Sequence, residues 1–183
     1  MTPTLYFLRS SEQNIATEMT NVAHRLDSIE KTVKDIKEFE IYNKSYGLTT
    51  KDLGLYALVD NKIAGAVWLR LLKEEDNATA FIDESVPILS IAVLPEFRLK
   101  GVGSSMLEQL LQEAGSLYKK ISVSCLSDES SRKFFKRHGF IQVENSSHKS
   151  IVDGADMLTM TKVVSEEKVV RPTDGYDPTR WMD

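Results

Sequence analysis

Hydrophobic residues in the first fifty positions form one short run and then two helical patterns. The run at 5–8 ends at Arg9, which predicts a short strand. Ser10, followed three residues later by Gln13, fits a capping box, so we expect Ser10 to be the N-cap of a helix. The apolar positions of that helix are Ile15, Met19, Val22 and Leu26. A second set at the same spacing predicts a second helix: Ile29, Val33, Ile36 and Phe39.

Three strands are expected next. Leu55–Val59 and Ile63–Leu72 are strand-like runs on either side of a tight turn at 60–61. The run Ile88–Leu94 is almost wholly apolar, which is typical of a central strand buried on both faces. Pro95 ends that strand, because proline cannot donate a backbone hydrogen bond.

The second half of the chain alternates helices and strands. Ser104 opens an amphipathic helix, and Ile121–Cys125 alternates as a strand does. A further helix is capped by Ser127 or Asp128 and ends at Gly139, which can adopt the left-handed conformation. The apolar face of the first of these helices is Met106, Leu107, Leu110, Leu111, Ala114 and Leu117. The two last predicted strands are 140–143 and 157–163.

The predicted order of elements is β-α-α-β-β-β-α-β-α-β-β. It indicates a single α/β domain with a central mixed sheet of about seven strands flanked by four helices. We assign residues 1–164 to this domain and 165–183 to a C-terminal tail that lacks periodicity. The apolar residues of the tail favour its docking on a surface: Val169, Val170, Tyr176 and Trp181. A homodimer is one arrangement that the sequence leaves open.

Charge and cysteine content narrow the class of protein. The chain has 23 Lys and Arg against 27 Asp and Glu, a net charge of −4, so it lacks the basic surface of a general nucleic-acid-binding protein. Cys125 is the only cysteine and the three histidines are scattered, so we expect no disulfide and no metal site. Without a signal peptide or a long apolar run, we expect a cytoplasmic protein that does not enter a membrane.

The segment between the central strand and the next helix carries Arg98-x-x-Gly101-x-Gly103. A helix N-terminus offers unpaired N–H groups to an anion, and glycines let the anion approach the backbone. A P-loop is excluded because Lys100 precedes Gly101 instead of following the last glycine. A dinucleotide fingerprint is excluded because Met106 replaces its third small residue. A diphosphate cradle and a plain strand-to-helix turn both remain.

The context of this segment resembles motif A of the GNAT superfamily of acyl-CoA-dependent N-acyltransferases. In that motif an apolar strand and Val-x-Pro precede Arg/Gln-x-x-Gly-x-Gly/Ala and an amphipathic helix. Residues 91–104 read Ile-Ala-Val-Leu-Pro-Glu-Phe-Arg-Leu-Lys-Gly-Val-Gly-Ser. Residues 134–140, Phe-Phe-Lys-Arg-His-Gly-Phe, are similar to the family's Phe-Tyr-x-x-x-Gly-Phe. The resemblance covers about residues 4–164, including the order of elements.

The resemblance implies acetyl-CoA as acyl donor, with no metal. It implies that the backbone of Ile91, Ala92 and Val93 borders the pantetheine arm, with the Val93 N–H donating to the thioester oxygen. It implies that Arg98 adds positive charge beside the pyrophosphate. Backbone N–H groups would cradle the pyrophosphate at Leu99, Lys100, Gly101, Val102, Gly103 and Ser104.

Two positions depart from the family pattern. Phe135 stands where the family often has a general-acid tyrosine, and a phenyl ring cannot protonate a thiolate. Asp128 stands where the family often has an asparagine that contacts the pantetheine arm. Both belong to the predicted cofactor-binding set.

Acyl transfer to an amine requires a neutral nucleophile, so a base or a water relay is expected. Glu84, beside Asp83 just before the central strand, is the base candidate, although both acids also fit a solvated turn. Ser127, at the end of the facing strand, is a candidate hydrogen-bond donor to the leaving thiol. Cys125 fits a small buried hydrophobe better than a nucleophile.

The predicted function is therefore N-acetyl transfer from acetyl-CoA to a primary amine, on a small molecule or a peptide, by direct attack in a ternary complex. Phe135 and Asp128 motivate an alternative, in which the chain is an acyl-CoA-binding sensor or regulatory module with reduced catalysis.

Overall fold

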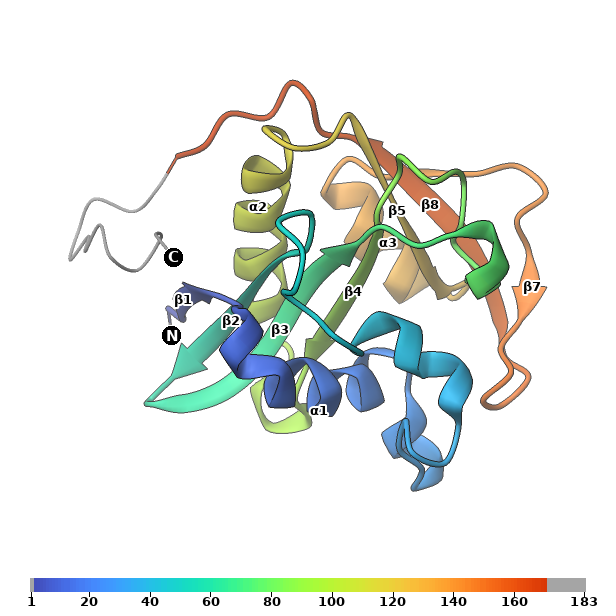
Figure 1. Ribbon diagram of the computed structural model, residues 1–183, viewed down its shortest axis with the longest axis horizontal. Helices are drawn as coiled ribbons and strands as arrows, with labels where there is room; N and C mark the ends of the chain where they lie inside the picture. The colour runs from blue at the N-terminus through green and yellow to red at the C-terminus, as the bar shows by residue number, and fades with distance from the viewer. Residues whose placement is uncertain (1, 171–183) are drawn as a thin grey trace.

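The computed structural model describes residues 2–170 and contains one mixed sheet (Figure 1). The strand order is β1-β2-β3-β4-β5-β8-β6, with β7 paired to β8. Only β4 and β5 run parallel, and every other pair is antiparallel. The strands are β1 (Thr4–Phe7), β2 (Leu53–Val59), β3 (Lys62–Arg70), β4 (Ile88–Val93), β5 (Lys120–Leu126), β6 (Ile141–Gln142), β7 (His148–Lys149) and β8 (Asp156–Val163). The predicted α/β domain with a central mixed sheet is confirmed.

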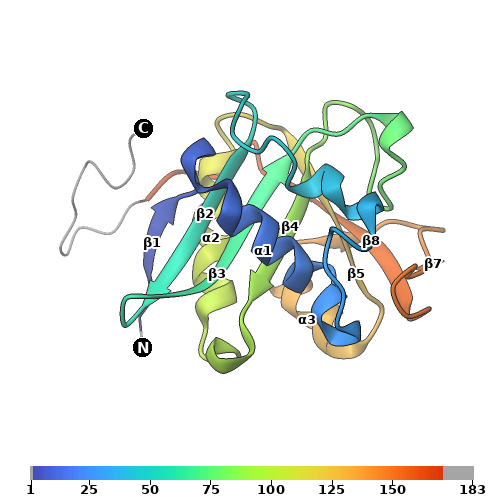
Figure 2. The same ribbon diagram turned by 60° about the horizontal axis from the view of Figure 1, so that its bottom comes forward.

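Helices cover both faces of the sheet (Figure 2). Helix α1 (Gln13–Ala23) packs Ile15 and Met19 against Trp68 and Ala92 on one face. Helices α2 (Val102–Ala114) and α3 (Glu129–Arg137) bury the larger core cluster on the other face. The alternation of side chains along a strand explains why β4 contributes to both layers.

The segments on either side of α1 correct two predictions. After α1, the chain forms two 3-10 segments instead of a second helix, η2 (Leu26–Ile29) and η3 (Lys37–Tyr42). Left-handed residues at Arg25 and Glu30 bound η2, so the backbone there cannot continue as a regular helix. The predicted capping box is wrong by one position, because the Glu12 carboxylate accepts from the Arg9 N–H at 2.9 Å.

A gap opens between β4 and β5. Ile88 and Ser122 are the one paired level, and Ser122 N–H donates to Pro87 O at 3.0 Å. Beyond that level β4 stays paired with β3, and β5 stays paired with β8. The two parallel strands therefore diverge towards their carboxyl ends.

Backbone amides of β4 point into this gap. Leu94 N–H donates to Ala64 O at 2.8 Å, so the amide of Leu94 faces β3. Because residues of an antiparallel pair alternate between hydrogen-bonded and non-hydrogen-bonded positions, the amides of Ile91 and Val93 face away from β3. They therefore border the gap as an unpaired strand edge.

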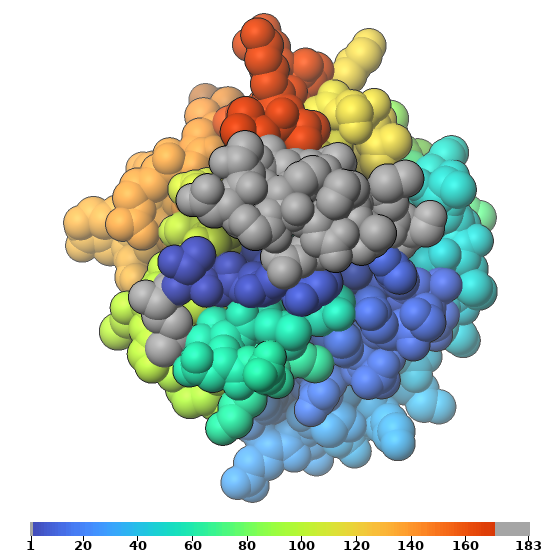
Figure 3. All heavy atoms as spheres, turned by 90° about the vertical axis from the view of Figure 1, so that its left-hand side faces the viewer, coloured from blue at the N-terminus to red at the C-terminus, as the bar shows by residue number. Residues whose placement is uncertain are grey.

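Figure 3 shows the sheet from its β1 edge, with β1 in dark blue beside the β2–β3 hairpin in teal.

Within the described part of the tail, Val170 N–H donates to the Gln112 side chain on α2 at 2.7 Å. The tail residues Pro172, Tyr176 and Trp181 lie outside the described residues. None of the helices within residues 2–170 combines the length and the hydrophobicity that a bilayer span requires.

Candidate functional site

A cavity of about 630 Å³ lies on the α2 face of the sheet, where the gap between β4 and β5 meets the start of α2. Nearly all of it is lined by the segment that the sequence singled out and by α3. The predicted site residues that line it are Ile91, Val93, Arg98, Leu99, Gly101, Val102, Gly103, Ser104 and Phe135. The other lining residues, which were not among the predicted site residues, are Phe97, Ser130, Ser131, Phe134 and Arg137.

The loop before α2 needs its glycine. Gly101 is the N-cap of α2 with φ +80°, a left-handed conformation that side chains rarely adopt. A Cβ placed on Gly101 would meet no atom within 4 Å, so it would project into open space at the cavity. The neighbouring Leu99 is also left-handed, with φ 61°, and its side chain is fully exposed. This backbone leaves the first N–H groups of α2 open to an anion, and it fits a diphosphate.

The basic residues of the loop have separate places. Arg98 lines the cavity, and its Nε donates to Val93 O at 2.9 Å. Lys100 Nζ donates to Glu96 O at 3.2 Å and does not line the cavity. Ala92 is not part of the lining either, because its side chain packs in the α1 layer.

Helix α3 accounts for both departures from the family pattern. Asp128 is its N-cap, where the carboxylate accepts from Ser131 N–H at 2.7 Å, and it does not line the cavity. Phe135 lines the cavity from within the core, where it is 5% exposed and packs edge-on against Phe134 and Phe140. The spacing of Ser130, Ser131, Phe134 and Arg137 on one helical face was the signal that could have found the missed residues.

The start of α2 and the end of α3 are tied together at this cavity. His138 Nε2 lies 3.2 Å from Ser104 Oγ. Partial burial lowers the pKa of His138, which favours its neutral form.

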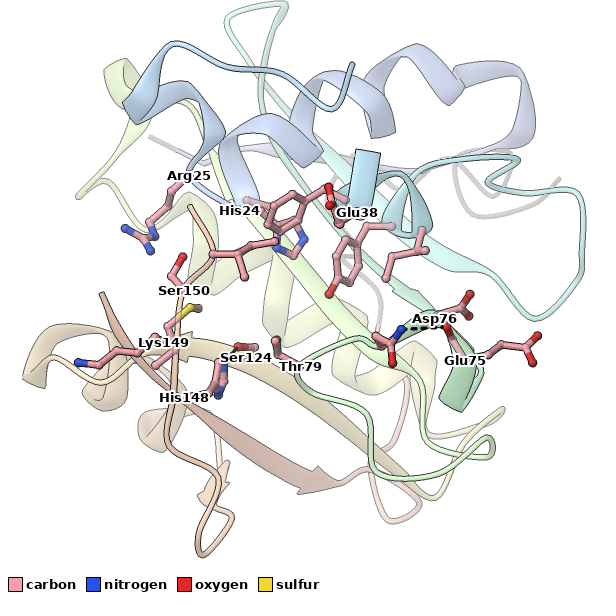
Figure 4. A pocket seen from close by; sticks show the side chains of 17 residues that line it. His24, Arg25, Glu38, Glu75, Asp76, Thr79, Ser124, His148, Lys149 and Ser150 are labelled. Carbon is pink, nitrogen blue, oxygen red and sulfur yellow. Dashed lines mark hydrogen bonds between the residues drawn. The ribbon is translucent and has the colours of Figure 1, made fainter. Parts of the chain in front are cut away.

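A second cavity, of about 500 Å³, lies on the opposite, α1 face of the sheet (Figure 4). It shares no lining residue with the first cavity. Ser124 and His148 lie together on one wall, His24 on the wall opposite, and Glu75 and Asp76 at one end. The sequence analysis missed this cavity, because segments from α1, η3, the β3–β4 loop, β5, β7 and β8 build it.

His24 and Ser90 form one polar contact beside this cavity. His24 Nε2 lies 3.3 Å from Ser90 Oγ on β4, and its ring stacks on Tyr42 with a centroid distance of 4.0 Å. Burial, and then the charge of Arg25, lower the pKa of His24 to about 3. His24 is therefore neutral near pH 7.

Ser124 and His148 form a second polar contact, at the same level along the strands as Ser90. Ser124 Oγ on β5 lies 3.1 Å from His148 Nε2 on β7. His148 Nδ1 lies 2.9 Å from the carbonyl oxygen of Ser146. Neither residue was a predicted site residue, because a two-residue strand such as β7 leaves no pattern in the sequence.

Other predicted catalytic residues lie elsewhere. Glu84 is exposed in the turn before β4. Asp83 in the same turn accepts from the Ser85 hydroxyl at 2.5 Å and from Ser85 N–H at 2.7 Å, and these bonds lower the pKa of Asp83. Ser127 is held by a bond from its N–H to Asp156 O. None of the three lines either cavity. Cys125 is buried in the core, as expected, and burial raises the pKa of its thiol to about 11.

The chain is similar to one known protein family. A family model described as the acetyltransferase (GNAT) family matches residues 19–140. No curated protein matches the chain in sequence. Within residues 2–170, no group of three metal-ligating side chains converges.

Solved structures share the fold at low sequence identity. A GNAT superfamily phosphinothricin acetyltransferase from Sinorhizobium meliloti, in complex with AcCoA, is 19% identical with a TM-score of 0.64, and the match covers 97% of both chains. The ribosomal-protein-S18-alanine N-acetyltransferase from Escherichia coli is 14% identical with a TM-score of 0.61, covering 96% of this chain and all of that one. An acetyltransferase of the GNAT family from Streptococcus pneumoniae is 16% identical with a TM-score of 0.63, covering 88% of this chain and 99% of that one.

Proposed function

Because this chain belongs to the GNAT family of acetyltransferases, we propose that it transfers an acetyl group from acetyl-CoA to a primary amine by direct attack in a ternary complex. The family makes the chain an acyltransferase. What we propose beyond this class is where the donor binds, that the acceptor is a primary amine, and that both substrates are bound when the acetyl group is transferred.

The gap between β4 and β5 carries the proposal. Its free amides, Ile91 and Val93, run from the loop at the start of α2 towards the closed end of the gap at Ile88. An extended arm of amide groups can pair with such an edge as an added strand would. With the diphosphate at the Gly101 loop, the sulfur end of the arm lies deepest in the gap. In this proposal the expectation for Val93 is revised: its N–H binds the arm, and Ile91 N–H is the nearer donor for the thioester oxygen.

The two cavities supply room for two substrates at once. They lie on opposite faces of the sheet, and each is lined by a strand that borders the gap: Ile91 and Val93 of β4 line the first, and Ser124 of β5 lines the second. In this proposal a donor from the α2 face and an acceptor from the α1 face approach each other across that gap. This arrangement favours direct attack, since no nucleophilic side chain has to carry the acetyl group between them. Cys125, the one thiol of the chain, is buried and its raised pKa keeps it protonated.

The acceptor cavity favours amines that carry positive charge. Glu38 and Glu75 line it and form no ion pair with any residue in the described part of the chain. The cations that line it are already paired, Arg25 with Asp153 at 2.5 Å and Lys149 with Asp156. The unpaired carboxylates therefore attract a cation to this cavity.

The reaction does not require the hydroxyl that Phe135 lacks. The amine nitrogen attacks the thioester carbon, the C–N bond forms, and the C–S bond breaks with its electron pair on sulfur. A thiol with a pKa of about 8.5 leaves readily as the thiolate and takes a proton from water. Proton removal from the nitrogen is the step that needs help from the protein.

Steady-state kinetics test the proposal. We expect free coenzyme A to appear only when both acetyl-CoA and an amine are present, and double-reciprocal lines to intersect as in a ternary mechanism. Parallel lines, or an acetylated enzyme detected by mass, would instead indicate a covalent intermediate. Binding of acetyl-CoA without amine-dependent turnover would favour the sensor alternative.

A further inference from the structure

We propose that Ser124 and His148 form a proton relay that takes the proton from the attacking amine, with the Ser124 hydroxyl in contact with the nitrogen and His148 Nε2 as the acceptor. The inference rests on the acetyl transfer proposed above and deepens it. It assigns the base to β5 and β7, and not to Glu84 in the exposed turn before β4.

The hydrogen bonds fix which tautomer His148 adopts when neutral. Nδ1 faces the carbonyl oxygen of Ser146 at 2.9 Å, and a carbonyl oxygen can only accept, so Nδ1 carries the proton. Nε2 then presents its lone pair to Ser124 Oγ at 3.1 Å. The Ser124 hydroxyl therefore donates to Nε2 and turns an oxygen lone pair away from His148. A hydroxyl in this state can accept a proton while it gives up its own.

The position of Ser124 brings this pair to the closed end of the gap. Ser122 is paired with Ile88, and Ser124 is the next residue of β5 whose side chain lies on the same face. Ser124 thus stands about 6 to 7 Å beyond the last paired level. Ile91, whose amide faces the gap from β4, is three residues beyond that level on its own strand. The acetyl carbon bound at Ile91 and an amine in the α1-face cavity therefore meet beside Ser124.

The partner serine on β4 has a different role. Ser90 corresponds to Ser124 across the gap, and it also contacts a histidine, His24, at 3.3 Å. His24 stacks on Tyr42 and lies tilted against Phe39, and its pKa of about 3 keeps it from accepting a proton near pH 7. The relay is therefore assigned to the contact at Ser124 and not to the contact at Ser90.

The relay step is balanced in protons. The neutral amine attacks the thioester carbon and becomes positively charged at nitrogen. That nitrogen gives one proton to Ser124 Oγ, while the Ser124 hydroxyl proton moves to His148 Nε2. The tetrahedral intermediate then expels the thiolate, and His148, which is half-buried at the cavity wall, returns its proton to solvent.

Several other titratable groups face His148 across the cavity and contribute to any pH profile. Those that line the same cavity are His24, Arg25, Glu38, Tyr42, Glu75, Asp76 and Lys149. Asp156 on β8 is opposite Lys149 and is paired with it. The test therefore compares variants at constant substrate and reports the difference between their profiles.

The first test is the pH dependence of kcat/KM in four proteins: wild type, His148→Gln, Ser124→Ala and Ser122→Ala. Ser122 is the matched control, because it lies two residues earlier on the same face and its hydroxyl bonds Ala80 O at 2.8 Å, away from any histidine. The relay requires the neutral form of His148, so we expect the wild-type rate to fall as the pH is lowered. His148→Gln should lower kcat/KM about a hundredfold at neutral pH. Its rate should also fall less than the wild-type rate when the pH is lowered. Ser122→Ala should keep the wild-type profile.

Two kinetic results would overturn the relay. One is a His148→Gln profile that parallels the wild-type profile with only a small loss in rate. The other is loss of the acidic limb in Glu84→Gln with His148→Gln unaffected, which would return the base to the turn before β4. Acetyl-CoA binding of each variant, measured by calorimetry, shows whether donor binding has been preserved.

The second test does not depend on turnover. Long-range proton–nitrogen NMR spectra of the uniformly labelled protein, with the His148 signals assigned by their loss in His148→Gln, report which ring nitrogen carries the proton. We expect the Nδ1–H tautomer for His148, and a shift of its Nε2 signal in Ser124→Ala. The Nε2–H tautomer would overturn the relay, even if the wild-type protein acetylates amines. Failure of wild type to bind acetyl-CoA or to transfer its acetyl group would overturn the proposed function and the relay with it, whereas the Nε2–H tautomer in an active wild type overturns the relay alone.

Discussion

Arg98 holds the edge of the central strand, because its Nε donates to the carbonyl oxygen of Val93 at 2.9 Å. This bond uses the last gap-facing carbonyl of β4 and brings the guanidinium to the rim of the α2-face cavity. The remaining N–H groups of Arg98 are thus held next to the loop that would receive the diphosphate. Arg98 therefore contacts both the edge of β4 and the cavity at the start of α2.

Replacing Arg98 should weaken the binding of acetyl-CoA. Arg98→Gln removes the charge beside the diphosphate, and we expect about a tenfold rise in Kd, equal to about 1.4 kcal/mol. Lys100→Gln should have a smaller effect, because Lys100 bonds Glu96 O and does not line the cavity. Calorimetry at low and high salt measures both. Equal losses for the two variants would contradict the separate places of these residues.

Restoring the family's tyrosine at Phe135 should not improve catalysis. Phe135 is 5% exposed and packs against Phe134 and Phe140 at centroid distances of 5.1 and 5.3 Å. A buried hydroxyl at Phe135→Tyr should cost about 1 kcal/mol of stability, and kcat should stay within about twofold. Urea unfolding and steady-state rates test this. A large rise in turnover from near zero would instead support the sensor alternative.

His24 predicts how stability depends on pH. Its pKa falls from the ordinary value of 6.5 when unfolded to about 3 when folded, so the unfolded chain binds the extra proton. The stabilisation is fully present above about pH 6.5 and is lost as pH falls towards 3, by up to about 1.4 kcal/mol per pH unit. His24→Gln should be less stable at pH 7 but should show a flatter dependence between these limits. Urea unfolding across that range measures it, and an unchanged slope would contradict the assigned burial.

The α1-face cavity should prefer an acceptor with two positive charges. We expect 1,4-diaminobutane to be acetylated with a lower KM than 1-aminobutane, because the second ammonium group reaches the unpaired carboxylates. Glu75→Gln should raise KM for the diamine severalfold with little change in kcat. Glu74→Gln is the matched control, since Glu74 is the neighbouring carboxylate outside the lining. Equal KM values for the two amines would rule out this role for Glu75.

The sequence predicted the elements around the α2-face cavity well, because they are continuous in the chain. An apolar strand, Pro95, the two glycines and an amphipathic helix each leave a local pattern, and β4, Gly101 and α2 stand where those patterns indicate. The fold of the last helix also followed from its cap, Asp128. As this cap, the Asp128 carboxylate accepts from the Ser131 N–H, and Asp128 does not line the α2-face cavity.

The α1-face cavity could not be predicted, because contacts between segments far apart in the sequence create it. His148 comes to Ser124 only because the two-residue strand β7 pairs with β8, a contact without a hydrophobic period. Val33 and Phe39 have the spacing of a helix, but this part of the chain forms short 3-10 segments instead, and the left-handed residues Arg25 and Glu30 bound the first of them. Those segments carry the aromatic wall of the cavity.

The most direct test of the central claim is calorimetric titration of acetyl-CoA into wild type, Gly101→Asp and Gly154→Asp. Both glycines have positive φ, +80° and +72°, and a Cβ on either meets nothing within 4 Å, so backbone strain is matched. Only Gly101 lines the cavity at the start of α2. We predict that wild type and Gly154→Asp bind alike and that Gly101→Asp loses about a hundredfold or more in affinity, because its carboxylate repels the diphosphate. Equal binding by the two variants, or no binding by wild type, would contradict the donor site.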